Sequence, residues 1–190
     1  MKLKREEWNE EMKQYDVRNL IFIDESGFQD NMTRLYGRII GGKRLNESAP
    51  GGVWNTTTMI SSISFNGSLA AMTIRGATDA EAFKTYVSKI LCPTLCKNQI
   101  VIMDNLRAHK VLGIRELIEE TGATLLYLPP YSPDLNPIEK MWSKIKSILR
   151  KMKARSKEEI NAAITAAFKE ITSSDARGWY ESCGYGLIQS

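Results

Sequence analysis

The chain has 190 residues, 43% of them hydrophobic and 25% charged, and its formal net charge is +4. This composition is ordinary for a soluble globular domain, and the length allows one domain with a substantial core. Each apolar run meets a charged residue within a few positions, and residues 1–16 contain no apolar segment, so neither a membrane span nor a secretory signal is expected. Three cysteines without framework spacing predict reduced thiols and a cytoplasmic protein.

The first half of the chain predicts a strand followed by a hairpin. Residues 19–25 are apolar on both alternating faces, which is typical of a buried strand. Two runs rich in strand-forming residues, 53–65 and 68–75, flank the pair Asn66-Gly67, which favours the tight turn of a β-hairpin.

The second half predicts helices that alternate with strands. Helices are expected at 79–91, 108–120, 137–151 and 157–171. Short strands are expected at 99–104 and 124–128. We find no internal repeat and no interdomain linker in the sequence. The order of elements therefore predicts an α/β fold in which a mixed sheet is flanked by helices.

Two aspartates stand at the ends of buried strands. Asp24 and Asp104 each continue one apolar face of the predicted strand that leads to them. Either aspartate alone would be explained as a turn residue or a helix cap. Two carboxylates at equivalent positions instead predict a ligand site, because a buried carboxylate is costly unless a cation or hydrogen-bond donors compensate it.

A third acid, Glu139, follows the proline-rich stretch 129–137 at the start of a predicted helix. Asn136 and Pro137 suit the N-cap and the first helical position, so Glu139 could be the glutamate of a capping box. A capping box needs no proline-rich approach, however, and each proline restricts its own backbone and that of the residue before it. The stiff approach favours a second interpretation, in which Glu139 is held at a site shared with both aspartates.

Basic side chains are concentrated in and after this helix. Residues 138–157 hold eight lysines and arginines against one acid, which leaves 18 basic and 21 acidic residues elsewhere from totals of 26 and 22. Most charge runs are solvated helix faces. This run is lopsided enough to favour an anionic partner such as nucleic acid. The candidates for phosphate contacts are Lys146 and Arg150, which fall near the face of Glu139, and Lys140 and Lys144.

Three carboxylates in one place repel each other unless cations compensate them. An all-oxygen site in a chain with one histidine suits Mg²⁺ or Mn²⁺ rather than Zn²⁺. Two such ions form the usual clamp for in-line displacement at a phosphodiester. With the basic helix, these features predict metal-dependent chemistry on DNA or RNA strands.

Three motifs resemble those of DDE transposases of the mariner superfamily, specifically its bacterial insertion-sequence branch. They are "IFIDESGF", "VIMDNLRAHK" and "YLPPYSPDLNPIEKMWSKIK", which contain the three acids in turn. The 34 residues between Asp104 and Glu139 match the spacing of that superfamily. The likeness extends over nearly all of residues 18–186.

The resemblance implies a ribonuclease-H-like fold with a five-stranded mixed sheet over residues 18–190, after a polar lead-in at 1–17. It implies that Asp24, Asp104 and Glu139 are catalytic and bind two Mg²⁺ or Mn²⁺ ions. It also implies cut-and-paste transposition, in which water cuts the transposon ends and the freed 3′-OH attacks target DNA. The expected setting is the bacterial cytoplasm or nucleoid, with a homodimer on DNA and no membrane.

Such transposases carry helix-turn-helix regions before the catalytic domain, and this chain begins only about twenty residues before Asp24. We therefore expect one of three origins: a truncated copy, a segment cut from a longer protein, or the second reading frame of a split element, in which an upstream helix-turn-helix product supplies DNA recognition.

Four other residues near the motifs have two interpretations each. Asn105 orients the metal site or caps a turn, and His109 contacts DNA or the metal ligands or begins a helix. Tyr131 and Trp142 stack on a flipped base or pack in the core, and packing is the stronger expectation.

Two other classes of function fit the same residues. A catalytically inactive regulatory fragment would bind DNA with a steep salt dependence and would not need Asp24. A structure-specific nuclease or ribonuclease H of the same fold would cleave without strand transfer. A glycosidase explains neither the third acid nor the basic helix.

Overall fold

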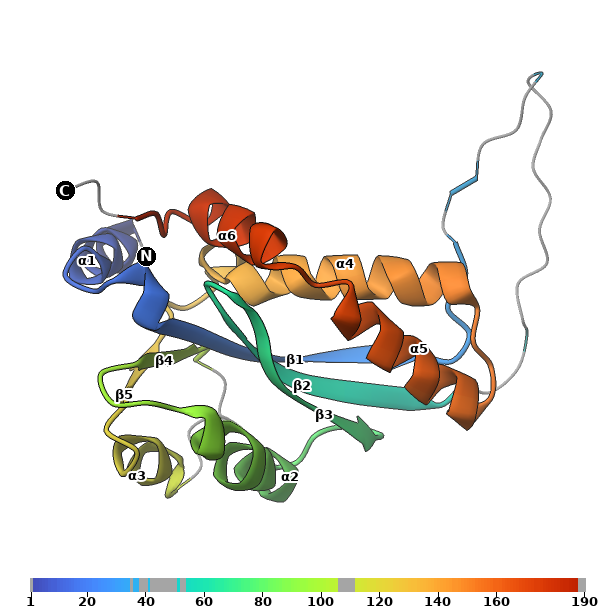
Figure 1. Cartoon of the computed structure of the whole chain (residues 1–190), viewed down its shortest axis with the longest axis horizontal. Helices are drawn as coiled ribbons and strands as arrows, with labels where there is room; N and C mark the ends of the chain where they lie inside the picture. The colour runs from blue at the N-terminus through green and yellow to red at the C-terminus, as the bar shows by residue number, and fades with distance from the viewer. Residues whose placement is uncertain are drawn as a thin grey trace.

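Five strands form one mixed sheet in the part of the chain that the structure describes (Figure 1). This structure is a computed structural model, and it describes residues 2–34, 36–37, 41, 51, 54–105 and 112–187. The strands are β1 (Leu20–Gln29), β2 (Thr56–Ser64), β3 (Gly67–Arg75), β4 (Ile100–Met103) and β5 (Thr124–Tyr127). Their order is β3-β2-β1-β4-β5, with β1 antiparallel to β2 and parallel to β4. The predicted mixed sheet is confirmed.

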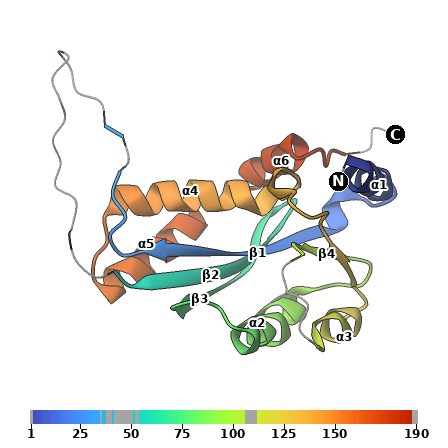
Figure 2. The same cartoon turned by 180° about the vertical axis from the view of Figure 1, so that it is seen from behind.

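Helices cover both faces of this sheet (Figures 1 and 2). One face is covered by α4 (Pro137–Met152), α5 (Lys157–Lys169) and α6 (Ser173–Ser182). The opposite face is covered by α2 (Ala80–Tyr86) and α3 (Ile114–Glu119), and α1 (Lys2–Met12) lies at one end of the sheet. Among the described helices, none is both long and apolar enough to cross a membrane.

The two faces have separate hydrophobic cores, because side chains alternate along each strand. Phe22 of β1 packs in the core that contains α4, whereas Ile23 packs in the core that contains α2 and α3. By the same alternation, Asp24 lies on the α4 side of the sheet and Glu25 lies on the α2 side. The pattern of β1 thus places one carboxylate beside the helix that starts at Pro137.

The hairpin turns one residue earlier than predicted. Gly67 pairs with Ser64 as the first residue of β3, so Phe65 and Asn66 form the two-residue loop. Gly67 has a φ of +131°, a conformation that its missing Cβ allows.

Two helices also differ from expectation. The helix expected at 108–120 is regular from Ile114 onward, because Gly113 stands before it with a φ of +92°; residues 106–111 lie outside the described residues. Helix α6 was not predicted, although Thr172 and Asp175 form a complete capping box at its start. That Thr-x-x-Asp spacing is the signal that would have located α6, whose Gly178 weakens the helical pattern.

Candidate active site

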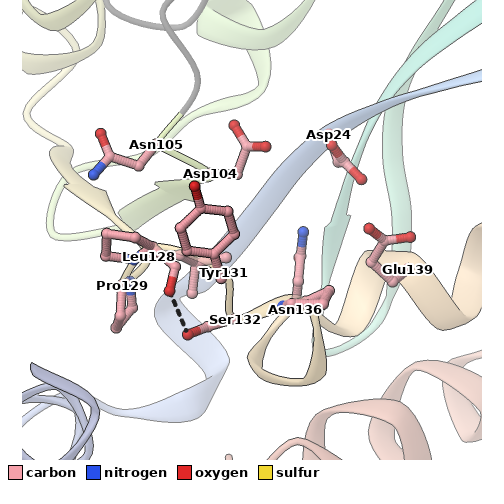
Figure 3. A pocket seen from close by; sticks show the side chains of 11 residues that line it. Asp24, Asp104, Asn105, Leu128, Pro129, Tyr131, Ser132, Asn136 and Glu139 are labelled. Atoms are coloured by element: carbon pink, nitrogen blue, oxygen red, sulfur yellow. Dashed lines mark hydrogen bonds between the residues drawn. The ribbon is translucent and has the colours of Figure 1, made fainter. Parts of the chain in front are cut away.

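The three predicted acids line a single cavity of about 430 Å³ (Figure 3). Asp24, Asp104 and Glu139 share it with Asn136 and with the backbone and side chains of residues 128–133. The acids come from β1, from the end of β4 and from the first turn of α4. Residues that are 80 positions and 115 positions apart in sequence from Asp24 are therefore brought to one place.

The parallel pairing of β1 with β4 places the two aspartates next to each other. Ile23 is in register with Met103, so the next residues along the two parallel strands, Asp24 and Asp104, lie beside each other. The prediction that Asp24 ends its strand is wrong. Strand β1 continues to Gln29, because it stays paired with β2 up to that residue. Asp104 does follow the last residue of β4. The site therefore opens where β4 stops and β1 continues.

Asp24 is the most buried of the three acids, with 8% of its surface exposed. Burial raises the pKa of Asp24 to about 8, with a further upward contribution from the charge of Glu139 and a smaller one from Asp104. Without a compensating cation, this carboxyl is therefore largely protonated at neutral pH. Trp142 of α4, itself buried, donates a hydrogen bond from Nε1 to Oδ2 of Asp24 across 3.2 Å.

The chemistry of these donors fits a hard divalent cation. The charged side chains that line the cavity are all carboxylates, which supply oxygen ligands only. Within the described residues, no three acidic, histidine or cysteine side chains are close enough together to enclose an ion by themselves. Mg²⁺ does not require such a cage, because it keeps several waters and binds through one or two carboxylates together with substrate phosphate. The acids therefore suit a Mg²⁺ site in which water and substrate phosphate supply the other ligands.

Glu139 is not part of a capping box. Asn136 occupies the N-cap position of α4, but its side chain makes no capping hydrogen bond. In contrast, α5 and α6 each begin with a complete capping box. The interpretation of Glu139 as the glutamate of a capping box is therefore wrong. Its carboxylate is directed at the cavity, as Figure 3 shows.

The proline-rich segment before Glu139 is braced from outside. Arg5 of α1 donates to Ser132 Oγ at 3.1 Å and forms an ion pair with Asp134. Tyr185 donates from its hydroxyl to the carbonyl oxygen of Leu135 at 2.8 Å and accepts a hydrogen bond from Trp8 Nε1 at 3.0 Å. The lead-in helix and the segment after α6 therefore hold the turn that places Asn136 and Glu139.

Tyr131 is the residue for which packing was the wrong expectation. Its side chain is 88% exposed at the edge of the cavity, and its backbone has a φ of +56°, which non-glycine residues seldom adopt. Trp142, by contrast, is packed as expected and contacts Phe168 edge to face. Asn105 lines the cavity beside Asp104 and is exposed. His109 lies outside the described residues.

The predicted phosphate contacts on α4 separate into two groups. Lys146 and Arg150 line an open hollow with Gly27, Phe28 and Thr56, on the side of the helix next to β1. Lys140 is exposed one residue after Glu139. Lys144 instead pairs with Asp175 at 2.6 Å and donates to the carbonyl oxygen of Glu170 at 2.8 Å. The structure thus gives Lys144 a tethering role toward α6, which departs from the predicted DNA contact.

A three-acid cavity in the middle of a mixed sheet, beside a basic helix, defines the catalytic-domain class of DDE-type endonucleases and transposases. Comparison with family models agrees: the model of the DDE superfamily endonuclease family matches residues 19–161. The chain belongs to this family. A search of curated proteins finds no match.

Solved structures support the fold. The Mos1 mariner paired-end complex with Mn matches with a TM-score of 0.79 at 17% identity, over 96% of this chain and 57% of that chain. The catalytic domain of Mos1 mariner transposase matches with a TM-score of 0.70 at 16% identity, over 100% of this chain and 93% of that chain. The chain thus spans a little over half of the longer Mos1 chain and has the ribonuclease-H-like fold.

Proposed function

We propose that the protein is the catalytic domain of a DNA transposase, which hydrolyses phosphodiesters at transposon ends and transfers the new 3′-OH into target DNA. The observation that carries the proposal is the meeting of Asp24, Asp104 and Glu139 at one cavity, with Asp24 buried beyond what its charge tolerates alone. Family membership and the fold of the Mos1 catalytic domain support the same class of chemistry.

The three acids would hold two Mg²⁺ or Mn²⁺ ions. Mos1 paired-end complexes with Mn and with Mg are among the matched structures. Such ions supply a more acidic water and charge stabilisation of the leaving oxygen. Asp24 interacts electrostatically with both Glu139 and Asp104, so we assign it the central position between the other two acids.

The proposed activity consists of two phosphoryl-transfer reactions. In the first reaction, water adds to phosphorus, the bond from phosphorus to the 3′ oxygen breaks, and that oxygen leaves as a 3′-OH. In the second reaction, this 3′-OH attacks a phosphodiester of the target and displaces its 3′ oxygen. Lys146 and Arg150 line a hollow that suits the backbone of the DNA leading to the cavity.

The partners follow from the same proposal. We propose that the chain acts on transposon-end and target DNA as a homodimer, with helix-turn-helix regions outside this segment to recognise the ends, in the bacterial cytoplasm or nucleoid. The matched Mos1 structures include a complex with a left transposon end and a strand transfer complex.

The test is cleavage of supercoiled plasmid by the purified chain in Mg²⁺, in Mn²⁺ and in EDTA. Asp104→Asn and Glu139→Gln keep the size of each side chain while removing its charge. We expect metal-dependent nicking that both variants lose. Nicking that persists in both variants would contradict the assigned acids.

Two further measurements separate the alternatives. A regulatory DNA-binding fragment would bind DNA equally well in EDTA and in Mg²⁺ and would not nick it. Calorimetry would then show the same Mg²⁺ binding for the wild type and for Glu139→Gln. A structure-specific nuclease would nick but would join no 3′-OH oligonucleotide to a target plasmid.

A further inference from the structure

Asn136 is a buried polar side chain without a partner. It is 3% exposed, and its Oδ1 is enclosed and accepts no hydrogen bond. Within the described residues, its side chain makes no hydrogen bond at all, and it does not cap α4 although it occupies the N-cap position. Leaving the buried Oδ1 acceptor unpaired costs about 1–3 kcal/mol, so an amide that turns its oxygen inward and its nitrogen toward the cavity calls for an explanation.

The backbone around Asn136 is held firmly, so the unpaired amide is not explained by a loose segment. The N–H of Asn136 donates to the carbonyl oxygen of Pro133 at 3.0 Å, and the carbonyl oxygen of Asn136 accepts from the N–H of Glu139 at 3.2 Å. Pro137 follows at once and fixes the entry to the helix. The braces from Arg5 and Tyr185 hold the preceding turn.

The amide is directed at the reacting space. Figure 3 shows the side chain of Asn136 rising between Asp104 and Glu139, with its nitrogen toward the middle of the cavity. The residues that line this cavity include no lysine, arginine or histidine among the described part of the chain. Ionised carboxylates only accept hydrogen bonds, so a donor to a bound phosphate must come from another residue that lines the cavity.

The other neutral donors of the cavity are less well placed. Ser132 already accepts from Arg5 and donates to the carbonyl oxygen of Pro130 at 3.4 Å. Asn105 and Tyr131 are exposed at the edge. Asn136 is therefore the donor that faces the centre of the cavity, because its buried Oδ1 is turned inward and its Nδ2 group points into the cavity.

We propose that the Asn136 Nδ2 group donates a hydrogen bond to a non-bridging oxygen of the phosphate that is attacked. This inference rests on the proposed function and adds a residue to it. In-line attack increases the negative charge on the non-bridging oxygens, and a fixed donor in a partly enclosed site stabilises that charge without reorganisation. Holding Asn136 away from the helix cap keeps the donor available for the substrate.

Asn136→Ser tests the inference because serine can cap a helix but is too short to reach the middle of the cavity. We expect the melting temperature to stay the same or rise, while kcat for nicking falls roughly 10- to 100-fold and the Kd for DNA in Ca²⁺ changes less than about threefold. Asn161→Ser, at an exposed position of α5, is the matched control and should change none of these values. A folded Asn136→Ser protein with wild-type kcat would overturn the inference.

A second readout does not depend on turnover. The side-chain NH₂ signals of Asn136 in a ¹⁵N NMR spectrum are those that Asn136→Ser removes. We expect them to shift when a short DNA duplex is added in Ca²⁺. A shift without any nicking by the wild type would keep the contact and reject the proposed chemistry. Nicking with no shift and no effect of Asn136→Ser would reject the contact and keep the chemistry, and the absence of both would reject the two together.

Discussion

The indole of Trp142 donates a hydrogen bond to the carboxyl group of Asp24 from within the core, which links helix α4 to strand β1. Trp142 lies three residues after Glu139 on the same helix, so one helix both carries an acid to the cavity and orients another. Positioning of two acids by one element makes the site sensitive to small movements of α4.

Replacing Trp142 by phenylalanine should keep most of the packing and remove the donor to Asp24. We expect about 1 kcal/mol lower stability and roughly tenfold slower nicking, because residues that orient metal ligands commonly contribute that much. Nicking rate, calorimetric Mg²⁺ affinity and melting temperature would be measured together. Phe168→Leu, which alters the ring that contacts Trp142, is the control. Equal losses in both variants would indicate a packing effect alone.

The raised pKa of Asp24 makes stability depend on pH when no metal is present. The native state keeps a proton on Asp24 up to about pH 8, whereas the unfolded chain loses it near its ordinary value of 3.8. The stabilising contribution is therefore complete below about pH 4 and is lost as the pH rises toward 8.

Asp24→Asn should remove this dependence. In EDTA at pH 8, we expect the variant to melt roughly 5 °C above the wild type, with the gap closing toward pH 4. Added Mg²⁺ should stabilise the wild type and leave the variant unchanged. Thermal melts across this pH range measure both effects, and a variant less stable than the wild type at pH 8 would contradict the assigned protonation.

The exposed ring of Tyr131 predicts a contact with a DNA base at the edge of the cavity. Base stacking on an aromatic side chain contributes about 1–3 kcal/mol, so Tyr131→Asn should weaken DNA binding roughly 5- to 150-fold. Asparagine tolerates the positive φ at this position, which guards the fold. Tyr131→Phe should bind like the wild type. Fluorescence anisotropy in Ca²⁺ gives these affinities, and unchanged binding by the asparagine variant would exclude stacking.

The basic residues of α4 should divide by function. Lys146→Ala and Arg150→Ala should each reduce the slope of log Kd against log salt by about one, as expected when one phosphate contact is lost. Lys144→Met should leave that slope unchanged. Binding titrations between about 50 and 300 mM salt measure these slopes. A reduced slope for Lys144→Met would show that its ion pair opens on DNA.

Lys144→Met should instead lower stability by about 1 kcal/mol, because it leaves Asp175 and the end of α5 without their cation at a partly solvated site. The hydrogen bond from Lys144, together with those from Thr172, lowers the pKa of Asp175 to about 2. This contribution is present above about pH 4 and lost as the pH falls toward 2, so the variant and the wild type should converge in acid. Urea melts at pH 7 and pH 2.5 measure the difference.

The sequence was sufficient for the sheet and for the three acids because these depend on local patterns. Buried strands, the residues that follow them and the helix start at Pro137 are all readable over short windows. The family resemblance then joined the three positions into one site. The prediction was weaker where neighbours in space decide the outcome.

Three positions illustrate that limit. Asp24 was expected at a strand end, but β2 extends β1 beyond it. Tyr131 was expected to pack, but a positive φ turns it outward. Lys144 was expected to face DNA, but Asp175, 31 residues away, holds it. The periodicity of hydrophobic residues over a short stretch of sequence gives no information on any of these three relationships.

The brace formed by Tyr185 also bears on when the site can form during synthesis. The ribosome makes residue 185 well after Glu139, and the hydroxyl of Tyr185 joins the carbonyl oxygen of Leu135 to the indole of Trp8. An unfinished chain therefore has all three acids before it has the clasp that fixes the turn carrying Glu139. For a protein proposed to cut DNA, the turn that carries Glu139 is therefore fixed only after a residue 46 positions farther along the chain has been made.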